Sequence, residues 1–245
     1  MTTARATALR EVRRQLSLPG SWLAIGLFAL LAGIAFVTTL DRFLEQNSEA
    51  LSGPSAQPID VNQLLIRPFL IQVGMAALVV LPLITARALP QDRRAGGALR
   101  VVLAAFAGVL GLYSVMLLAS LALVALLFVH GAPEWGPIAS GYLGLLLAGA
   151  AFISAALFIS SLSTSAAGAG VATFAVALML GAAAWLARSG TAAAQPVFRY
   201  LSVGEGLDDF AKGIVDTGHL AWCLTIVALG LFLSVRALEP RESGH

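Results

Sequence analysis

The residues of this chain that could do chemistry are few and scattered. Glu205, Asp208 and Asp209 stand close enough in sequence to hold a cation, but acidic residues at this spacing also suit the first turn of a short helix. The single cysteine and the three histidines do not have the spacing of metal ligands. The sequence therefore predicts no catalytic, cofactor-binding or metal-binding residue, and the chain is not expected to be an enzyme.

Nucleotide binding is excluded on similar grounds. The only lysine, Lys212, is followed by Gly213 and Ile214, so the chain has no Gly-x-x-x-x-Gly-Lys-Ser/Thr loop to hold phosphates. Ion-coupled transporters place titratable side chains at membrane depth, where each charge costs about 2.5–3.5 kcal/mol to insert. The apolar stretches of this chain lack such residues in their middles. If the protein moves a substrate, we expect the energy to come from another chain.

One charged segment, residues 85–100, could make specific contacts with a partner. Pro90 suits the first turn of a short helix, and Gly96 and Gly97 suit its end. The alternative is a charged loop that only fixes the topology. A protruding helix is what a partner would grip, and the candidate contact residues are Arg87, Pro90, Gln91, Asp92, Arg93 and Arg94.

Six long apolar stretches surround these polar segments. A helix rises about 1.5 Å per residue and bilayer hydrocarbon is about 30 Å thick, so about twenty apolar residues suffice to cross. The mean hydropathy of +0.87 and the charged fraction of 11% exclude an ordinary soluble domain. We expect an all-α membrane protein with one domain, residues 1–245. Its six transmembrane helices are predicted at 22–40, 69–86, 101–129, 138–162, 166–187 and 220–235.

The distribution of charge predicts the orientation of these spans. With both termini in the cytoplasm, ten of the 15 Lys and Arg residues lie inside, whereas nine of the 13 Asp and Glu residues lie outside. Cytoplasmic enrichment of Lys and Arg is the established orientation signal. The basic residues therefore indicate membrane lipids and topology rather than nucleic acid, since no basic patch interleaved with aromatic residues is present.

The N-terminal arm, residues 4–18, has a helical pattern. Apolar residues recur on one face, and Arg10, Arg13 and Arg14 fall on another. A basic amphipathic helix of this kind lies in the headgroup plane beside an anionic leaflet. The two alternatives are an interfacial helix that touches a cytoplasmic partner and a basic flank that only fixes the orientation.

The fifth apolar stretch is rich in small residues, which let helix backbones approach closely. The candidates for such packing are Gly168, Gly170 and Gly181. They fit packing against another helix of the same subunit and packing against a second subunit equally well.

The external segments are expected to be mostly loop. Residues 41–68 are polar and long enough to carry a short helix, and a second short external helix is predicted before the sixth span. We expect His219 to be solvated and Cys223 to be a small buried residue within the sixth span.

This layout resembles the permease subunits of type-2 ATP-binding-cassette (ABC) exporters, in particular the branch that includes gliding-motility and nitrous-oxide-reductase maturation permeases. Residues 85–96 begin Thr-Ala-Arg and end Arg-Arg-Ala-Gly, similar to that branch's Thr-x-Arg…Lys/Arg-Arg-Ser-Gly segment. Residues 200–217 resemble its segment Leu-Ser…Phe…Arg-Gly-Val-Ile-Asp-Thr before the sixth span. The likeness in layout covers essentially the whole chain.

The resemblance implies a non-catalytic subunit of the bacterial cytoplasmic (inner) membrane that pairs with a second permease subunit, either a copy or a relative. Separate ABC ATPase subunits, which bind ATP and Mg²⁺, would grip residues 90–94 as a coupling helix and drive export. The family has a Glu after Gly-Thr in this helix and a Ser-Pro soon after it, whereas this chain has Leu99 and Ala104-Ala105. Because of these differences at Leu99 and Ala104-Ala105, the way in which an ATPase would bind this subunit stays open.

Two other functions fit the residues. A membrane scaffold or anchor, which organises other proteins and transports nothing, fits the spans rich in small residues equally well. A passive channel should show a polar stripe along one helix, of which Ser154, Ser160 and Ser163 are a sparse version. A cavity open to one side of the membrane would favour transport, and a solidly packed bundle would favour a scaffold.

Overall fold

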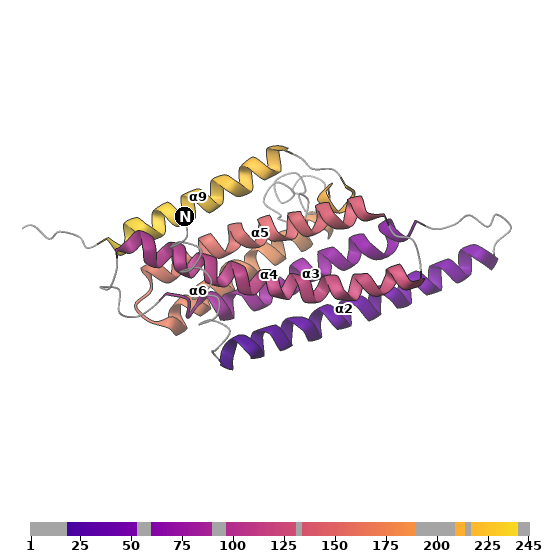
Figure 1. Cartoon of the computed structure of the whole chain (residues 1–245), viewed down its shortest axis with the longest axis horizontal. Coiled ribbons are helices and arrows are strands. Elements are labelled where there is room, and N and C mark those ends of the chain that lie inside the picture. Colours follow the sequence, from indigo (N-terminus) through magenta and orange to yellow (C-terminus); the bar gives the residue numbers. More distant parts are fainter. Residues whose placement is uncertain are drawn as a thin grey trace, which may run out of the picture.

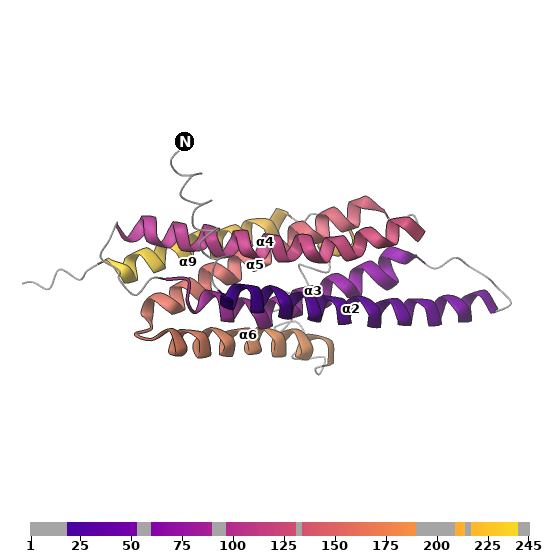
Figure 2. The same cartoon turned by 60° about the horizontal axis from the view of Figure 1, so that its bottom comes forward.

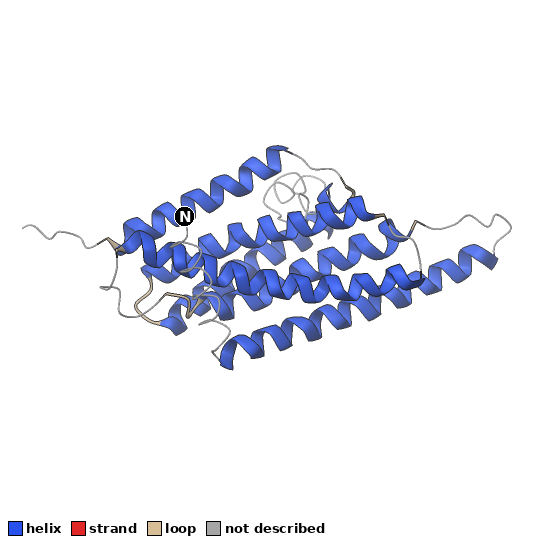
Figure 3. Cartoon of the chain, in the orientation of Figure 1, coloured by secondary structure: helices blue, strands red, loops and turns tan. Residues whose placement is uncertain are grey.

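The computed structural model describes residues 19–52, 60–89, 97–130, 134–189, 209–213 and 217–239. Within these ranges every regular element is helical, and six helices are long and apolar enough to span a membrane. They run alternately in opposite directions as an elongated bundle (Figure 1, Figure 3). For the described residues, the prediction of an all-α protein with six helices able to span a membrane is confirmed.

Five of the six helices begin and end near the limits of the predicted spans, and the first does not. The elements are α2 (Pro19–Ser52), the π-helix η1 (Asn62–Ile66), α3 (Arg67–Thr85), α4 (Ala98–His130), α5 (Trp135–Leu162), α6 (Ala166–Ser189) and α9 (Thr217–Leu238). The predicted interfacial helix at 4–18 lies outside the described residues. So does most of the short external helix before the sixth span, of which one helical turn at 209–211 is described.

Helix α2 continues well beyond the predicted first span. Its 34 residues correspond to about 51 Å, compared with about 30 Å of hydrocarbon. Both views show its C-terminal end extending past the neighbouring helices (Figure 1, Figure 2). The interpretation of residues 41–68 as mostly loop is therefore wrong over 41–52. These residues are polar but include good helix formers, and no glycine or proline interrupts them until Gly53 and Pro54.

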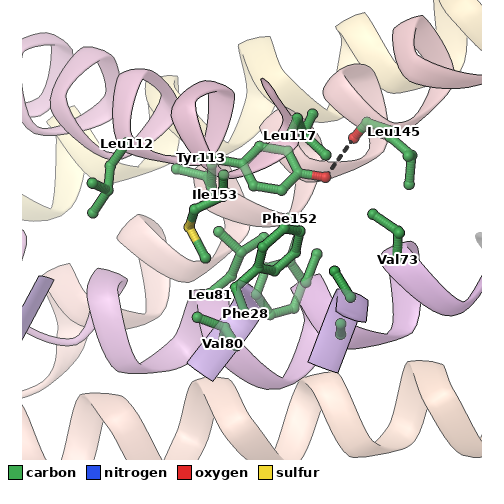
Figure 4. Packing of buried hydrophobic residues seen from close by; sticks show 14 of the residues in the cluster. Phe28, Val73, Val80, Leu81, Leu112, Tyr113, Leu117, Leu145, Phe152 and Ile153 are labelled. Atoms are coloured by element: carbon green, nitrogen blue, oxygen red, sulfur yellow. Dashed lines mark hydrogen bonds between the residues drawn. The ribbon is translucent and has the colours of Figure 1, made fainter. Parts of the chain in front are cut away.

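Helix α5 lies at the centre of the bundle. It packs against α3, α4, α6 and α9, whereas α2 packs on α3 and α4 at one side. In Figure 2, α6 lies below α2 and α3, and α9 lies alongside α4 and α5. The buried core between the helices is aromatic and aliphatic. Phe28, Tyr113 and Leu145 are almost fully enclosed (Figure 4), and so is Phe69.

Small residues allow α5 to take this central position. A Cβ added at Gly149 would overlap the ring of Tyr113 on α4, and one added at Gly144 would lie 2.9 Å from the Cβ of Phe210. The Tyr113 hydroxyl donates a hydrogen bond of 3.0 Å to the carbonyl oxygen of Leu145, so the same side chain is also fixed to α5 (Figure 4). Close approach of this kind is what holds helices together in a membrane.

Polar contacts between other helices follow the same principle. Gln72 Nε2 on α3 donates to Thr39 Oγ1 on α2 at 2.9 Å, and Thr39 Oγ1 in turn donates to the carbonyl oxygen of Ala35 at 2.7 Å. Ser154 Oγ on α5 lies 2.8 Å from the carbonyl oxygen of Ala151 in the same helix and 3.3 Å from the carbonyl oxygen of Ile226 on α9. Its hydroxyl proton is therefore shared between acceptors in two helices. Neither hydroxyl is left unpaired in hydrocarbon.

Replacing Gly149 by alanine is expected to destabilise the bundle, because the new Cβ would overlap the Tyr113 ring. Overpacking of this kind costs about 1–3 kcal/mol. The matched control is Gly33→Ala on α2, where nothing lies within 4 Å of the added Cβ and where alanine is the better helix former. Thermal unfolding in detergent measures both variants. Equal midpoints would contradict the close contact between α4 and α5.

Candidate functional site

The predicted contact segment connects α3 to α4 at one end of the bundle. Because the helices alternate in direction, this end also holds the starts of α2 and α6 and the ends of α5 and α9 (Figure 1). Three arginines whose side chains are exposed, Arg87, Arg100 and Arg236, lie here. Glu239 is the one acidic residue at this end among those described, and the other described acidic residues lie at the opposite end. We call this the basic end.

A tight turn positions Arg87. The backbone N–H of Ala86 donates to the carbonyl oxygen of Pro82 and that of Ala88 donates to Thr85, both at 3.1 Å. Ala88 is fully buried, which anchors the turn in the bundle while Arg87 points outward. Arg87 Nη1 lies 3.8 Å from the position of a Cβ added at Gly20, so this side chain reaches from the end of α3 to the start of α2.

The remaining predicted contact residues, Pro90, Gln91, Asp92, Arg93 and Arg94, lie outside the described residues. So do Arg10, Arg13 and Arg14 of the N-terminal arm. These residues stay predictions.

The chain is described again at Gly97, whose φ of +79° suits glycine because a side chain is rarely accommodated there. It leads directly into α4, and Leu99 in the first turn of α4 is exposed. Ala105, one of the two alanines at the place of the Ser-Pro in the permeases that the sequence resembles, is buried in the bundle. An apolar side chain, Leu99, thus stands at the entry of α4.

Arg236, one of the three exposed arginines of the basic end, is held locally. Arg236 Nη1 lies 3.2 Å from Glu239 Oε2, and its guanidinium carbon lies 5.6 Å from the centre of the Phe232 ring. Both partners of the ion pair are largely exposed, so the pair contributes little to stability. Arg236 therefore lies at the same end as the connecting segment, but its own contacts are with Glu239 and Phe232.

The three glycines of α6 have different surroundings. The N–H of Gly168 donates to Ser165 Oγ at 3.1 Å, which caps the start of the helix. A Cβ at Gly170 would lie 3.2 Å from the Cβ of Ala86, so Gly170 packs against the turn after α3 in the same chain. Gly181 has nothing within 4 Å of an added Cβ. Gly181 is half-buried and lies at the edge of the packed face of α6, and it is the glycine of the three with open space around its added Cβ.

The segment before the sixth span is docked on α5. Phe210 is fully buried against Gly144, and Ser140 Oγ donates to the Phe210 carbonyl oxygen at 2.6 Å. His219 packs edge-on to Phe210 and stacks on Trp222, with ring centres 5.9 and 6.0 Å apart. The expectation that His219 is solvated holds in part: the side chain is half-buried, because these two aromatic rings cover part of it.

The structure offers no cation site in the acidic cluster as far as it is described. Asp209 Oδ1 lies 3.3 Å from Lys212 Nζ, while Glu205 and Asp208 lie outside the described residues. No group of three or more His, Cys, Asp or Glu side chains that could hold a metal ion occurs within the described ranges. Cys223 is buried in α9, as predicted.

An apolar cavity of about 270 Å³ lies between five helices, and sequence reasoning did not anticipate it. Its walls include Leu78 of α3, Tyr113 of α4, Gly149 of α5, Val176 of α6 and Cys223 of α9. The lining residues extend from Ile71 to Ile226, 155 positions apart in the chain. No local pattern marks them, because the cavity depends on which helix faces which.

Comparison with known proteins does not identify a family: no family model matches the sequence, and no curated protein matches it. The likeness to ABC permeases therefore rests on the layout and the two motif segments described above.

The contact between α3 and α6 at the basic end can be tested by cross-linking. In a Cys223→Ser background, Ala86→Cys with Gly170→Cys should form a disulfide within the chain, since the 3.2 Å between the two Cβ positions is only slightly below the usual range of about 3.5–4.5 Å. Mass spectrometry should show loss of both free thiols with no change in oligomeric state. Ala86→Cys with Gly181→Cys is the control and should stay reduced within the chain. Two free thiols in the first variant would contradict this packing.

Proposed function

We propose that this chain is the membrane (permease) subunit of an ABC exporter, which moves its substrate with ATP hydrolysed by a separate nucleotide-binding subunit. The observation that carries the proposal is the exposed Arg87 turn at the basic end, directly before the charged segment that resembles the coupling region of type-2 permeases. The chain itself contributes no nucleotide-binding residue, so ATP and Mg²⁺ belong to the partner.

The charge distribution supports a cytoplasmic position for the basic end. Lys and Arg are enriched on the cytoplasmic side of membrane proteins, and with both termini inside the full sequence puts ten of its 15 Lys and Arg residues on the side of the basic end, Arg87, Arg100 and Arg236 among them. ATP is hydrolysed in the cytoplasm, so a coupling segment is useful only on that side. The orientation inferred from charge and the position of the connecting segment agree, and we infer a multi-pass protein of a bacterial inner membrane with both termini cytoplasmic.

The packing around the connecting segment supports a mechanical role for it. Ala88 is buried in the bundle, Arg87 reaches the start of α2, and Gly170 of α6 packs on Ala86. A partner that pulls on residues 87–94 therefore acts on α2, α3 and α6 together. Three helices that share one attachment point are suited to convert closure of an ATPase into tilting of spans.

A second permease subunit is the other proposed partner. Helix α6 packs on α3 and α5 with one side only, and its outer face exposes Val171, Leu178 and Met179. In a single subunit this face lies against lipid. A second copy or a relative that packs there would complete a path between the two subunits, as the resemblance implies.

The test begins with purification from the native membrane together with the products of neighbouring genes. A nucleotide-binding protein should co-purify, and its ATP hydrolysis should depend on the membrane subunit. Recovery of other proteins without any nucleotide-binding subunit would favour the scaffold instead.

Arg93→Ala with Arg94→Ala should weaken the response of the ATPase to the membrane subunit. Hydrogen bonds to charged groups contribute about 1.5–3 kcal/mol, so we expect the affinity to fall by about tenfold or more. The matched control is Arg236→Ala, an exposed arginine of the same end whose ion pair is formed within α9 and its flank. Titration of the ATPase with the reconstituted subunit measures the effect. An unchanged response in the double variant would remove these arginines from the contact.

The subunit interface can be tested through α6. In a Cys223→Ser background, Leu178→Cys should form a disulfide between two copies under mild oxidation, if the pairing surface is the outer face of α6, where Leu178 is exposed. Gly170→Cys is the control, because this position faces Ala86 of its own chain. A non-reducing gel measures the covalent dimer. Equal dimer yields from the two variants would argue against an interface centred on this face.

A further inference from the structure

The cavity between α3, α4, α5, α6 and α9 has the properties of a binding site for hydrocarbon. Its walls carry apolar side chains, and the hydroxyl of Tyr113 is already engaged by the Leu145 carbonyl oxygen. A buried water needs two to four polar partners, whereas apolar cavities stay dry. A cavity of about 150 Å³ is known to admit benzene, and this one measures about 270 Å³. Its chemistry selects an apolar occupant.

The extent of the cavity along the membrane normal limits what that occupant is. Its wall on α3 runs from Ile71 to Leu81 and its wall on α5 from Leu145 to Ala155. Ten residues of helix rise about 15 Å, which is half of the hydrocarbon thickness of about 30 Å. This is the depth of one leaflet, the distance that a single acyl chain of a membrane lipid covers.

The cavity opens sideways to the bilayer. Helix α6 packs on α3 and α5, α9 packs on α4 and α5, and α6 and α9 make no substantial contact with each other although both line the cavity. Trp222 of α9 lines the cavity and is also 41% exposed, so it stands where the cavity meets the surface. The next residue, Cys223, lines the cavity and is only 2% exposed.

We propose that this cavity is a lipid site that takes one acyl chain from the surrounding bilayer through the gap between α6 and α9. The chain lies against Leu145 and Cys223, two side chains that are almost fully buried and that a lipid reaches only by entering. Figure 4 shows Leu145 with three further wall residues, Leu81, Tyr113 and Phe152. The site does not depend on an ATPase partner, since it lies within one subunit.

The proposal is tested with the full chain reconstituted in vesicles of phosphatidylcholine that carries a photoreactive diazirine near the middle of one acyl chain. After irradiation, mass spectrometry should locate adducts at Leu145 and Cys223 in addition to exposed residues such as Leu30 of α2. Adducts confined to exposed residues would overturn the proposal, whether because the gap is too narrow or because a second copy of the chain covers it.

Variants that fill the cavity make the test specific. Ala151→Phe should abolish the adducts at Cys223 and leave those on α2 unchanged, because Ala151 lines the cavity. If Ala151→Phe does not fold, Ala155→Phe at the half-buried edge of the same wall replaces it. Ala175→Phe, on the exposed face of α6, is the control and should keep the adducts. Persistence of the Cys223 adduct in a folded, filled variant would overturn the assignment.

A free fatty acid offers the same hydrocarbon chemistry as a phospholipid tail. The experiment is therefore repeated with a diazirine fatty acid as the probe, with unlabelled phosphatidylcholine as the competitor. We expect the phospholipid to suppress labelling at Leu145 and Cys223. Labelling by the fatty acid that resists competition would overturn the phospholipid as the occupant.

Discussion

The structure depends on the close approach of helices to α5. Lipid tails are as apolar as leucine, so hydrophobic burial does not drive helices together within a bilayer, and van der Waals contact and hydrogen bonds between helices have to do so. On α5 these contacts coincide: the Tyr113 ring covers Gly149 while its hydroxyl bonds to Leu145, and Phe210 fills the notch at Gly144 while its carbonyl oxygen accepts from Ser140. At both places close packing on a glycine is combined with a hydrogen bond, and these contacts fix α5 to its neighbours.

The number of spans could be predicted because apolar length is a local property of sequence. The turn at 163–165 was placed correctly for the same reason, since Ser and Thr interrupt two apolar runs there. The length of α2 could not be predicted from hydropathy, because a helix ends at residues that break it and not at the surface of the bilayer. The surroundings of His219 and the cavity beside Cys223 depend on contacts between distant helices. Such contacts leave no pattern in a single sequence.

For the candidate site, sequence and structure contribute different parts. The motif segments and the charge bias select residues 85–100, and the structure adds that Arg87 and Ala86 connect this segment to α2 and α6. The proposed partner would therefore act on the periphery of the bundle while α5 and its close neighbours keep their packing. The cavity lies between these two regions, with α6 on one side and α9 on the other. A movement of α6 relative to α5 would alter the width of the gap through which lipid enters.

The length of α2 gives the molecule a lever. The helix is fixed to α3 as far along as the hydrogen bond between Thr39 and Gln72, and about 20 Å of helix continues from Thr39 to Ser52. Rotation by about 10° about that contact would displace the far tip by about 3 Å, given a rise of about 1.5 Å per residue. A shift of α3 would thus be transmitted to the end of α2, which carries the exposed residues Glu45 and Glu49.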